Sequence, residues 1–367
     1  MSKHGALAKI VLCPMSWLYG VGTYVRNKCF DFGLLKEKEF DVPVIVVGNL
    51  AVGGTGKTPH VEYIIEHMRH SHHMAMVSRG YKRSTSGFVM ATRRSTPADI
   101  GDEPYQIYHK FGCEVPVAVC EDRVKGIAEL LRIDPDINLI VLDDAFQHRY
   151  VKPTVSVLLT EQSRPFFEDS MLPYGRLRES RAGVRRADIV VASKCSERMR
   201  DIDLRIFEEN LKLSAWQRVF FSKLAYGKLK PIFPDEAPDV APALDWLTDE
   251  DMLYIVAGIG NPKPFVRYLK HFKPSVRVNV FSDHHNYSKR DMAFIQKRFE
   301  TMGGKHKFMV TTEKDAVRMA NSPYFPHSLK RYAYYLPIKV GFLRDGGEGF
   351  IDQIRKVIKE KERLRNT

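Results

Sequence analysis

The chain has 367 residues, of which 44% are hydrophobic and 28% charged, as is ordinary for a soluble globular protein with room for two domains. Its five cysteines form no C-x-x-C pair, which argues against a structural zinc site or a disulfide framework and fits a reducing cytosol. The formal net charge of +13 implies an acidic partner, which would be a nucleic acid, an anionic membrane surface or a phosphorylated substrate. A basic chain with a solvated surface is the alternative that charge alone leaves open.

The first segment, residues 1–38, predicts a helix with an apolar face. An uncharged run extends from Ile10 to Val25, contains Pro14 and is bracketed by basic residues. The run is shorter than the roughly 20 residues that span a bilayer, and no small-residue cleavage site indicates a secretory signal. We therefore expect an amphipathic helix that lies in an anionic membrane interface. A helix packed on the protein's own core has the same periodicity, so this alternative stays open.

The most informative pattern is a phosphate-binding loop between a strand and a helix. Residues 42–47 are apolar and β-branched, as in a buried strand, and apolar residues recur at helical spacing after Pro59. The glycine-rich turn between them supplies the residues that we expect to bind nucleotide: Gly53, Gly54, Thr55, Gly56, Lys57 and Thr58. Its backbone amides would hold phosphate oxygens, Lys57 would reach the outer phosphates, and Thr58 would hold Mg²⁺.

The loop departs from the usual pattern at one position. Ala51 stands where glycine is usual, and the doubled glycine is similar to the deviant loops of partition-type ATPases, which carry a lysine where this chain has Val52. A glycine-rich turn that binds nothing is the alternative, and the flanking strand and helix argue against it.

Two polar loops follow in the first half of the chain. Arg79 and Tyr81 come directly after a predicted strand, where an α/β sheet binds ligands, and suit an anionic group and a sugar face. A solvated basic loop is the alternative. Asp102 and Glu103 open a helical pattern, and acids at a helix start are most simply explained as compensation of the helix dipole.

The strand at 138–142 ends in Asp143 and Asp144. An apolar strand that ends in aspartate, downstream of a phosphate loop, is typical of the second element that organises Mg²⁺.

Arg123 follows the strand at 115–119. Arg178 and Glu179 lie in a turn-rich basic loop.

Strands alternate with helices through this half, which predicts an α/β fold with a mostly parallel sheet covered by helices on both faces. The predicted organisation is an N-terminal helix segment at 1–38, a phosphate-loop kinase domain at 39–215, a linker at 216–242, a smaller α/β domain at 243–340 and a basic C-terminal helix with a solvated face at 341–367.

The second half adds no cofactor motif. The Gly-x-Gly at 258–260 lacks the third glycine of a dinucleotide fingerprint, so NAD binding is not expected. The adjacent His284 and His285 point apart and have no suitably spaced third ligand, which argues against zinc.

Together the motifs resemble the tetraacyldisaccharide 4′-kinase family, which acts in the lipid A pathway of Gram-negative bacteria. The resemblance covers residues 1 to about 340, and Ala51 belongs to the family's own form of the loop. The segments that carry it are Val46–Pro59, Ser78–Tyr81, Gly101–Pro104, Asp143–Arg149, Leu177–Glu179, Ala257–Pro262, Asp283–His285 and Thr312–Asp315.

The resemblance implies transfer of the ATP γ-phosphoryl group to the 4′-hydroxyl of a tetraacylated disaccharide 1-phosphate, which gives lipid IVA, with Mg²⁺ as the metal. It implies that Asp102, paired with His284, abstracts the hydroxyl proton, with Lys57 as the third catalytic residue. The implied metal ligands are Thr58, Asp143, Asp144 and Glu103, and the implied substrate-binding residues are Arg79, Tyr81, Arg123, Arg178 and Glu179. It also implies a peripheral enzyme on the cytoplasmic face of the inner membrane, with no nucleic acid and no protein partner.

Two alternatives stay open from the residues alone. A cytosolic kinase of a soluble phosphosugar would share the phosphate loop but would not need the N-terminal helix. An ATPase that binds nucleic acid through its basic surface would need no acceptor pocket and no pair of Asp102 with His284.

Overall fold

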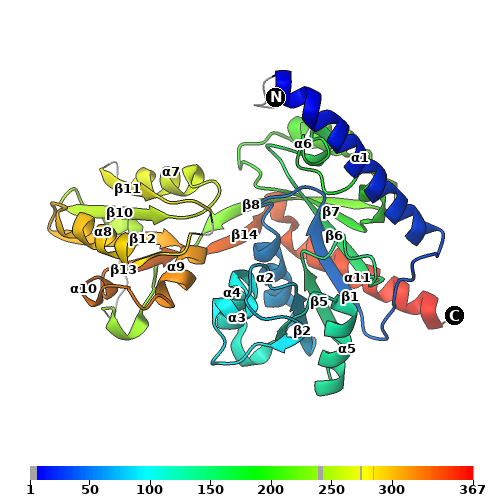
Figure 1. Cartoon of the computed structure of the whole chain (residues 1–367), viewed down its shortest axis with the longest axis horizontal. Coiled ribbons are helices and arrows are strands. Elements are labelled where there is room, and N and C mark those ends of the chain that lie inside the picture. Colours follow the sequence, from blue (N-terminus) through cyan, green and yellow to red (C-terminus); the bar gives the residue numbers. More distant parts are fainter. Residues whose placement is uncertain (1–5, 239–242, 273–274, 284, 367) are drawn as a thin grey trace. The chain divides into compact units, whose positions relative to one another are not determined.

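The computed structural model describes residues 6–238, 243–272, 275–283 and 285–366, which divide into two compact units. Unit 1 contains the described residues of 1–93, 107–224 and 340–367. Unit 2 contains those of 94–106 and 225–339. Figure 1 labels the helices and strands of both units. The units do not follow the chain order, because residues 94–106 belong to unit 2 although unit 1 flanks them on both sides.

Unit 1 is built on a nine-stranded sheet in the order β14-β8-β7-β6-β1-β5-β2-β4-β3. Its strands are β1 (Val44–Asn49), β2 (Met74–Ser78), β3 (Val89–Met90), β4 (Val117–Val119), β5 (Leu139–Asp143), β6 (Val155–Glu161), β7 (Ile189–Ser193), β8 (Arg218–Tyr226) and β14 (Ile338–Phe342). The pairings from β4 across to β8 are parallel, and β3 joins the edge antiparallel to β4. Strands β1, β2, β5 and β7 are buried along their whole length, which explains why their sequences do not alternate.

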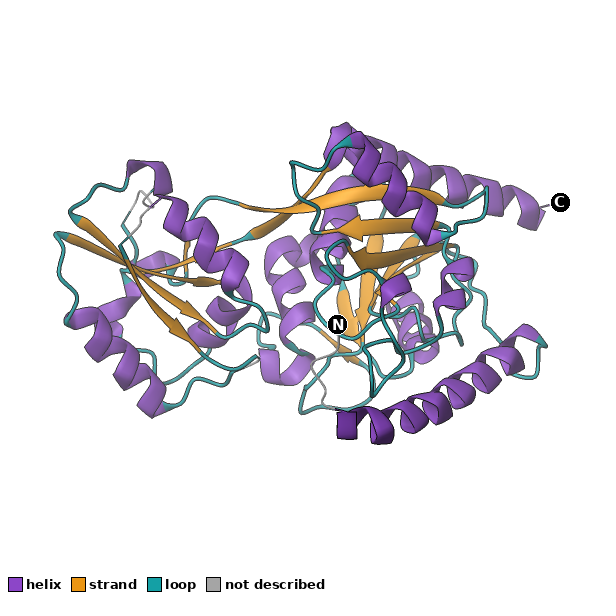
Figure 2. Ribbon diagram, turned by 90° about the horizontal axis from the view of Figure 1, so that it is seen from above, coloured by secondary structure: helices purple, strands orange, loops and turns teal. Residues whose placement is uncertain are grey.

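Helices surround this sheet, as Figure 2 shows. The helices of unit 1 are α1 (Ala6–Asp31), α2 (Lys57–Met68), α5 (Arg123–Ile133), α6 (Asp201–Leu211), α11 (Gly346–Asn366) and the second half of α4 (Asp102–Phe111). The first half of α4 and α3 (Pro97–Ile100) belong to unit 2. The core lies between the sheet and its helices and is dominated by Val, Ile, Leu and Phe. The predicted α/β class with a mostly parallel sheet is confirmed.

The sheet register brings the predicted polar loops to one edge. Strand β1 lies between β5 and β6, with Val47 opposite Asp143 and Asn49 opposite Leu159. Because these strands are parallel, the loops that follow them leave from the same carboxyl edge of the sheet.

Unit 2 is a second, smaller α/β unit. Its sheet has the order β11-β10-β12-β13-β9, and only β9 is antiparallel to its neighbour. The strands are β9 (Lys230–Pro231), β10 (Asp251–Ala257), β11 (Val276–Val280), β12 (His306–Thr312) and β13 (Ala333–Leu336), and the remaining helices are α7 (Lys263–Phe272), α8 (Lys289–Glu300), α9 (Glu313–Ala320) and α10 (His327–Lys330).

Two expectations from the sequence differ from the structure. Residues 219–224, assigned to a linker, form most of β8, and Ser222 in its centre is fully buried. The proline-rich run after this strand suggested a linker, but its first proline, Pro231, lies in the short edge strand β9. The C-terminal helix is not fully solvated, because Phe350, Ile351 and Ile354 are buried on one face.

Candidate active site

The phosphate loop connects β1 to α2 with the geometry that its glycines predict. Gly53 and Gly56 have φ angles of 113° and 86°, a backbone region that glycine adopts without strain. Gly56 is also the N-cap of α2, and no side chain caps the helix there. The first amides of α2 are therefore available to an anion, and the helix dipole adds partial positive charge.

Residues that the sequence analysis did not single out hold this loop in place. Asn49 Nδ2 donates to Thr55 Oγ1 at 2.9 Å, and Ser193 Oγ at the end of β7 donates to the Thr55 carbonyl at 2.7 Å. Arg176 Nε donates to the Val52 carbonyl at 2.8 Å. The loop is thus fixed from three sides, as a preorganised phosphate site requires.

His60 connects the first turn of α2 to β8. Its Nδ1 lies 2.7 Å from the Gly56 carbonyl oxygen, and its Nε2 lies 2.8 Å from Ser222 Oγ. The ring is fully buried, and this burial lowers the pKa of His60 to about 4, against the smaller raising effect of the Gly56 carbonyl. His60 is therefore neutral at physiological pH, with Nδ1–H donating to Gly56 and Nε2 accepting from Ser222.

Lys57 and Thr58 face the two aspartates at the end of β5. Thr58 Oγ1 lies 3.2 Å from Asp143 Oδ2, and Lys57 Nζ lies 3.6 Å from Asp144 Oδ1. Asp144 has a φ angle of 50°, which is unusual for a non-glycine residue. Arg178 also pairs with Asp144, at 3.1 Å.

These charges fix the ionisation of Asp144. Burial of the carboxylate favours its neutral form, but the positive charges of Lys57 and Arg178 outweigh burial and hold the pKa of Asp144 below its ordinary value. The carboxylate is thus ionised throughout the physiological range.

The donor set fits Mg²⁺. The Thr58 hydroxyl and the buried Asp143 carboxylate converge, and Mg²⁺ in phosphoryl-transfer sites is commonly held by one or two carboxylates together with substrate phosphates. Among the described residues, no cluster of three or more His, Cys, Asp or Glu side chains could form an all-protein metal cage. Glu103, the remaining predicted ligand, belongs to unit 2, where Lys314 Nζ lies 2.6 Å from its carboxylate.

A second group of predicted residues is strongly cationic. Arg123 is only 4% exposed, and its guanidinium donates to the carbonyl of Glu121 at 2.8 Å. Its Nε is buried without a hydrogen-bond partner among the described residues. Burial lowers the pKa of Arg123, and the positive charge of Arg79 lowers it further. The assignment of Arg79 and Arg123 to substrate binding stays a prediction, which this concentration of positive charge favours.

The remaining predicted substrate residues differ in their surroundings. Tyr81 is exposed. Glu179 is buried, and its carboxylate accepts hydrogen bonds from Arg186, Gln147 and Asn27 at distances of 2.8 to 3.1 Å. Through these donors Glu179 connects the loop at 171–179 to α1 and to the loop after β5. Glu179 therefore has a structural role in unit 1.

The predicted proton acceptor lies in unit 2. Asp102 stands at the start of α4 and forms an ion pair with Arg318 of α9. Burial opposes the charge of Arg318, but its hydrogen bond to Asp102 outweighs burial and raises the pKa of Arg318. His284, the predicted partner of Asp102, lies outside the described residues. The neighbouring His285 pairs instead with Asp291, at 3.1 Å.

Helix α1 lies along the outside of unit 1 in both Figure 1 and Figure 2. It contacts unit 1 through a narrow, mostly polar stripe: Ser16 Oγ donates to the Met171 carbonyl at 3.0 Å, Tyr19 Oη to the Arg178 carbonyl at 2.9 Å, and Asn27 to Glu179. Its apolar side chains are largely exposed, namely Ile10, Val11, Met15, Trp17, Leu18, Val21, Tyr24 and Val25. Within the described ranges, no helix is both long and apolar enough to cross a membrane.

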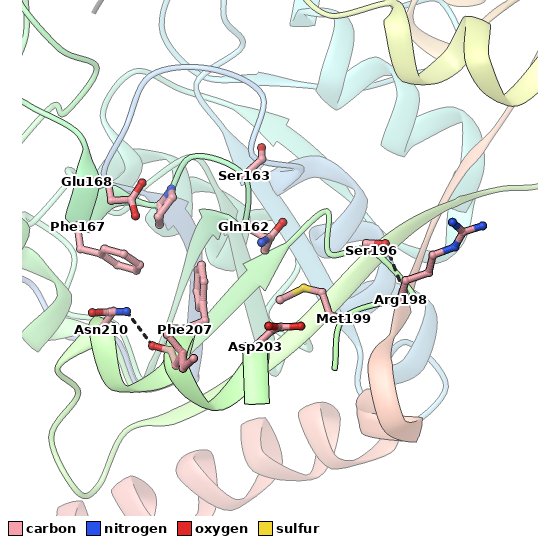
Figure 3. Close-up of a pocket in the computed structure, with 12 residues that line it drawn as sticks. Gln162, Ser163, Phe167, Glu168, Ser196, Arg198, Met199, Asp203, Phe207 and Asn210 are labelled. Atoms are coloured by element: carbon pink, nitrogen blue, oxygen red, sulfur yellow. Dashed lines mark hydrogen bonds between the residues drawn. The ribbon is translucent and has the colours of Figure 1, made fainter. Parts of the chain in front are cut away.

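A separate cavity of about 450 Å³ lies beside α6, and Figure 3 shows it. Its lining mixes apolar side chains, among them Phe167, Met199 and Phe207, with polar ones such as Glu168 and Arg198. The described residues that line it include none of the predicted site residues.

Comparisons with known proteins show the family of this chain. A family model described as Tetraacyldisaccharide-1-P 4'-kinase matches residues 8–359. Relatives named Tetraacyldisaccharide 4'-kinase include those of Bacteroides thetaiotaomicron, 46% identical with coverage of 99% of this chain and 97% of the relative, and of Flavobacterium johnsoniae, 41% identical with coverage of 96% and 98%.

A solved structure is also similar across both units. The crystal structure of "apo" form LpxK from Aquifex aeolicus in complex with ATP is 27% identical, has a TM-score of 0.71 and covers 94% of this chain and 98% of that chain. The predicted phosphate-loop fold and phosphotransferase class are thereby confirmed. The chain belongs to the tetraacyldisaccharide 4′-kinase family.

Proposed function

We propose that this chain transfers the γ-phosphoryl group of ATP to the 4′-hydroxyl of a tetraacylated disaccharide 1-phosphate in lipid A biosynthesis. The observation that carries the proposal is the convergence of Lys57 and Thr58 on the two aspartates at the end of β5, at 3.6 Å and 3.2 Å. Family membership, together with the solved relative in complex with ATP, supports this nucleotide and this acceptor.

The phosphate loop positions the nucleotide, and its charges stabilise the transition state. The amides of 53–58 hold the phosphates, and Lys57 balances the charge that develops on the γ-phosphoryl oxygens. Thr58 and Asp143 would hold Mg²⁺, with Asp144 beside them, and the metal would neutralise charge on the β- and γ-phosphates.

The acceptor side uses the cationic pair of Arg79 and Arg123 for binding and Asp102 for the proton. Arg79 and Arg123 would bind the 1-phosphate of the disaccharide, with Tyr81 against the sugar and Arg178 between the two sites. Asp102, oriented by His284, would accept the proton of the 4′-hydroxyl. The hydroxyl oxygen then bonds to the γ-phosphorus while the bond to the β–γ bridging oxygen breaks, and ADP leaves with that electron pair.

The exposed apolar face of α1 supports a location at a membrane surface. The acyl chains of such a substrate stay in the bilayer, so the enzyme has to work at the interface. Polar contacts that attach one side of α1 and exposed Ile, Leu, Val and Trp on the other are the arrangement of an interfacial helix. The positive net charge favours anionic lipid, and we assign the enzyme to the cytoplasmic face of the inner membrane.

The test is transfer of radiolabelled phosphate from ATP to the purified tetraacyldisaccharide 1-phosphate, beside a soluble glucosamine 1-phosphate acceptor and a nucleic acid. Only the lipid should be phosphorylated. Lys57→Ala should reduce transfer by at least ~10²-fold, whereas Lys125→Ala on the exposed side of α5 should not. Transfer to the soluble acceptor alone, or ATP hydrolysis that depends on nucleic acid, would contradict the proposal.

A further inference from the structure

Helix α9 carries a group of charged residues that the resemblance leaves without a role. Asp315 is fully buried, and its carboxylate accepts hydrogen bonds from the Gly258 amide at 2.9 Å, from Thr312 Oγ1 at 2.6 Å and from the Tyr287 hydroxyl at 3.1 Å. These donors come from the end of β10, the α9 N-cap and the segment before α8. Because three elements bind one buried carboxylate, the start of α9 is rigidly fixed within unit 2.

Arg318 lies one turn further along α9, between two carboxylates. Its NH1 atom is 3.8 Å from Asp315 Oδ1, and its Nε is 3.2 Å from Asp102 Oδ2. The Arg318 side chain is only 8% exposed. The charge of the buried Asp315 attracts the guanidinium from one side, at a distance longer than a hydrogen bond, and Asp102 binds it on the other. A planar guanidinium confined between two carboxylates has little freedom, so it fixes the direction of the Asp102 carboxylate.

Two further contacts join the start of α4 to α9. Lys314 Nζ lies 2.6 Å from the Glu103 carboxylate, and Asn321 Nδ2 donates to the Tyr105 hydroxyl at 3.2 Å. The first turn of α4 is thus attached to α9 by Lys314, Arg318 and Asn321. These contacts explain why residues 94–106 belong to unit 2 although the chain on both sides belongs to unit 1.

We propose that Arg318 is a positioning residue for the reaction: buried beside the charge of Asp315, it holds the Asp102 carboxylate in the orientation in which that carboxylate accepts the proton of the acceptor hydroxyl. The inference rests on the proposed role of Asp102. Binding at Oδ2 orients the carboxylate without removing its capacity to accept a proton, because a carboxylate has about four lone-pair sites.

The test compares Arg318→Met and Arg318→Lys with Asp102→Ala and with the double variant Asp102→Ala/Arg318→Met. Arg318→Met should lower kcat by ~10²-fold, the order expected when a reacting group is misplaced by about 1 Å. The KM for ATP should stay within about twofold, because the phosphate loop binds the nucleotide without Arg318. Arg318→Lys, which keeps the charge, should restore part of kcat. Lys330→Met is the matched control, since Lys330 pairs with Glu236 elsewhere in unit 2.

The double variant Asp102→Ala/Arg318→Met shows whether Arg318 acts through Asp102 or independently of it. If Arg318 acts through Asp102, Arg318→Met should cost less than about threefold in the Asp102→Ala background. The inference would be overturned if the kcat losses of the two single variants multiply in the double variant. A normal kcat in either folded Arg318 variant would overturn it as well. If Arg318→Met does not fold, the same comparison of kcat values is made with Arg318→Lys and with the double variant Asp102→Ala/Arg318→Lys. A loss of kcat in the first that is absent in the Asp102→Ala background would support the inference, and multiplicative losses would overturn it. Normal turnover in Asp102→Ala would instead reject the proposed proton acceptor, and failure of the lipid to accept phosphate would reject the proposed function itself.

Discussion

The Thr58 hydroxyl lies 3.2 Å from the Asp143 carboxylate, although the two residues are 85 positions apart in the sequence. The parallel pairing of β1 with β5 creates this proximity, because both strands end at the same edge of the sheet. The pair joins a hydroxyl and a carboxylate, the two oxygen ligands that phosphate-loop enzymes offer to Mg²⁺.

Asp143→Asn should raise the Mg²⁺ concentration required for half-maximal activity and lower kcat by ~10²-fold or more, because one negative ligand is lost. The measurement is a Mg²⁺ titration of phosphoryl transfer. Asp201→Asn, on the exposed surface of α6, is the control and should leave both values unchanged. An unchanged metal requirement in Asp143→Asn would mean that the carboxylate is structural.

Arg123→Met should weaken binding of the lipid acceptor and leave ATP binding nearly intact. A hydrogen bond to a charged group contributes about 1.5–3 kcal/mol, which corresponds to a ~10- to 100-fold rise in the KM of the acceptor. Arg132→Met on the same helix is the matched control, because Arg132 is exposed and pairs only weakly with Glu129 at the surface. Equal effects on the two substrates would show that Arg123 does not select the acceptor.

The phosphate loop and Asp143 could be predicted because each is a local pattern, a strand followed by a short polar loop. The residues that hold the loop could not be predicted in this way. Ser193 is 138 positions from the carbonyl it binds, and Arg318 is 216 positions from Asp102. Such contacts depend on how the strands and helices assemble, and serine or arginine at these positions has no distinctive spacing.

Strand β8 could not be predicted from the sequence for a different reason. Its residues are mostly half-buried, so its sequence has neither the continuous apolar run of a central strand nor a clean alternation. Its strand character comes from its place between β7 and β14, which is a property of the assembled sheet.

The apolar face of α1 should bind membranes independently of the stability of the fold. Val11, Leu18 and Val25 are all more than half exposed, so replacing all three with serine should leave the melting temperature nearly unchanged. If each contributes roughly 1 kcal/mol by partial burial in lipid, binding to anionic vesicles should fall by ~10²-fold. Ile133→Ser, on α5, should not change vesicle binding.

This substitution is a sharper test than removal of the helix. Deletion of residues 1–30 would also remove Asn27 and its hydrogen bond to the buried Glu179. The deletion could therefore lower the stability of the fold as well as membrane binding, and the two effects could not be told apart. Unchanged vesicle binding in the triple serine variant would contradict an interfacial role for this face.

The buried His60 should make the stability of the phosphate-loop region depend on pH. Its pKa is about 4 in the folded chain, against an ordinary value of 6.5. Above pH 6.5 neither the folded nor the unfolded chain carries a proton there. Between pH 6.5 and 4 only the unfolded chain binds this proton, so the free energy of unfolding falls as the pH falls. The shift corresponds to about 3 kcal/mol in total.

The measurement is urea unfolding of the intact protein and of His60→Gln at pH 7.5, 6.0 and 5.0. The variant should be less stable at pH 7.5, because it loses contacts with Gly56 and Ser222, but the difference between the two proteins should narrow toward pH 5.0. His327→Gln is the control, since its side chain is 81% exposed, and its curve should run parallel to that of the intact protein. A constant difference between His60→Gln and the intact protein would mean that folding leaves the pKa of His60 unchanged, and a difference that widens toward pH 5.0 would mean that His60 takes up a proton in the fold. In that case the hydroxyl of Ser222 would accept a hydrogen bond from Nε2, and a positive charge would lie beneath the phosphate loop.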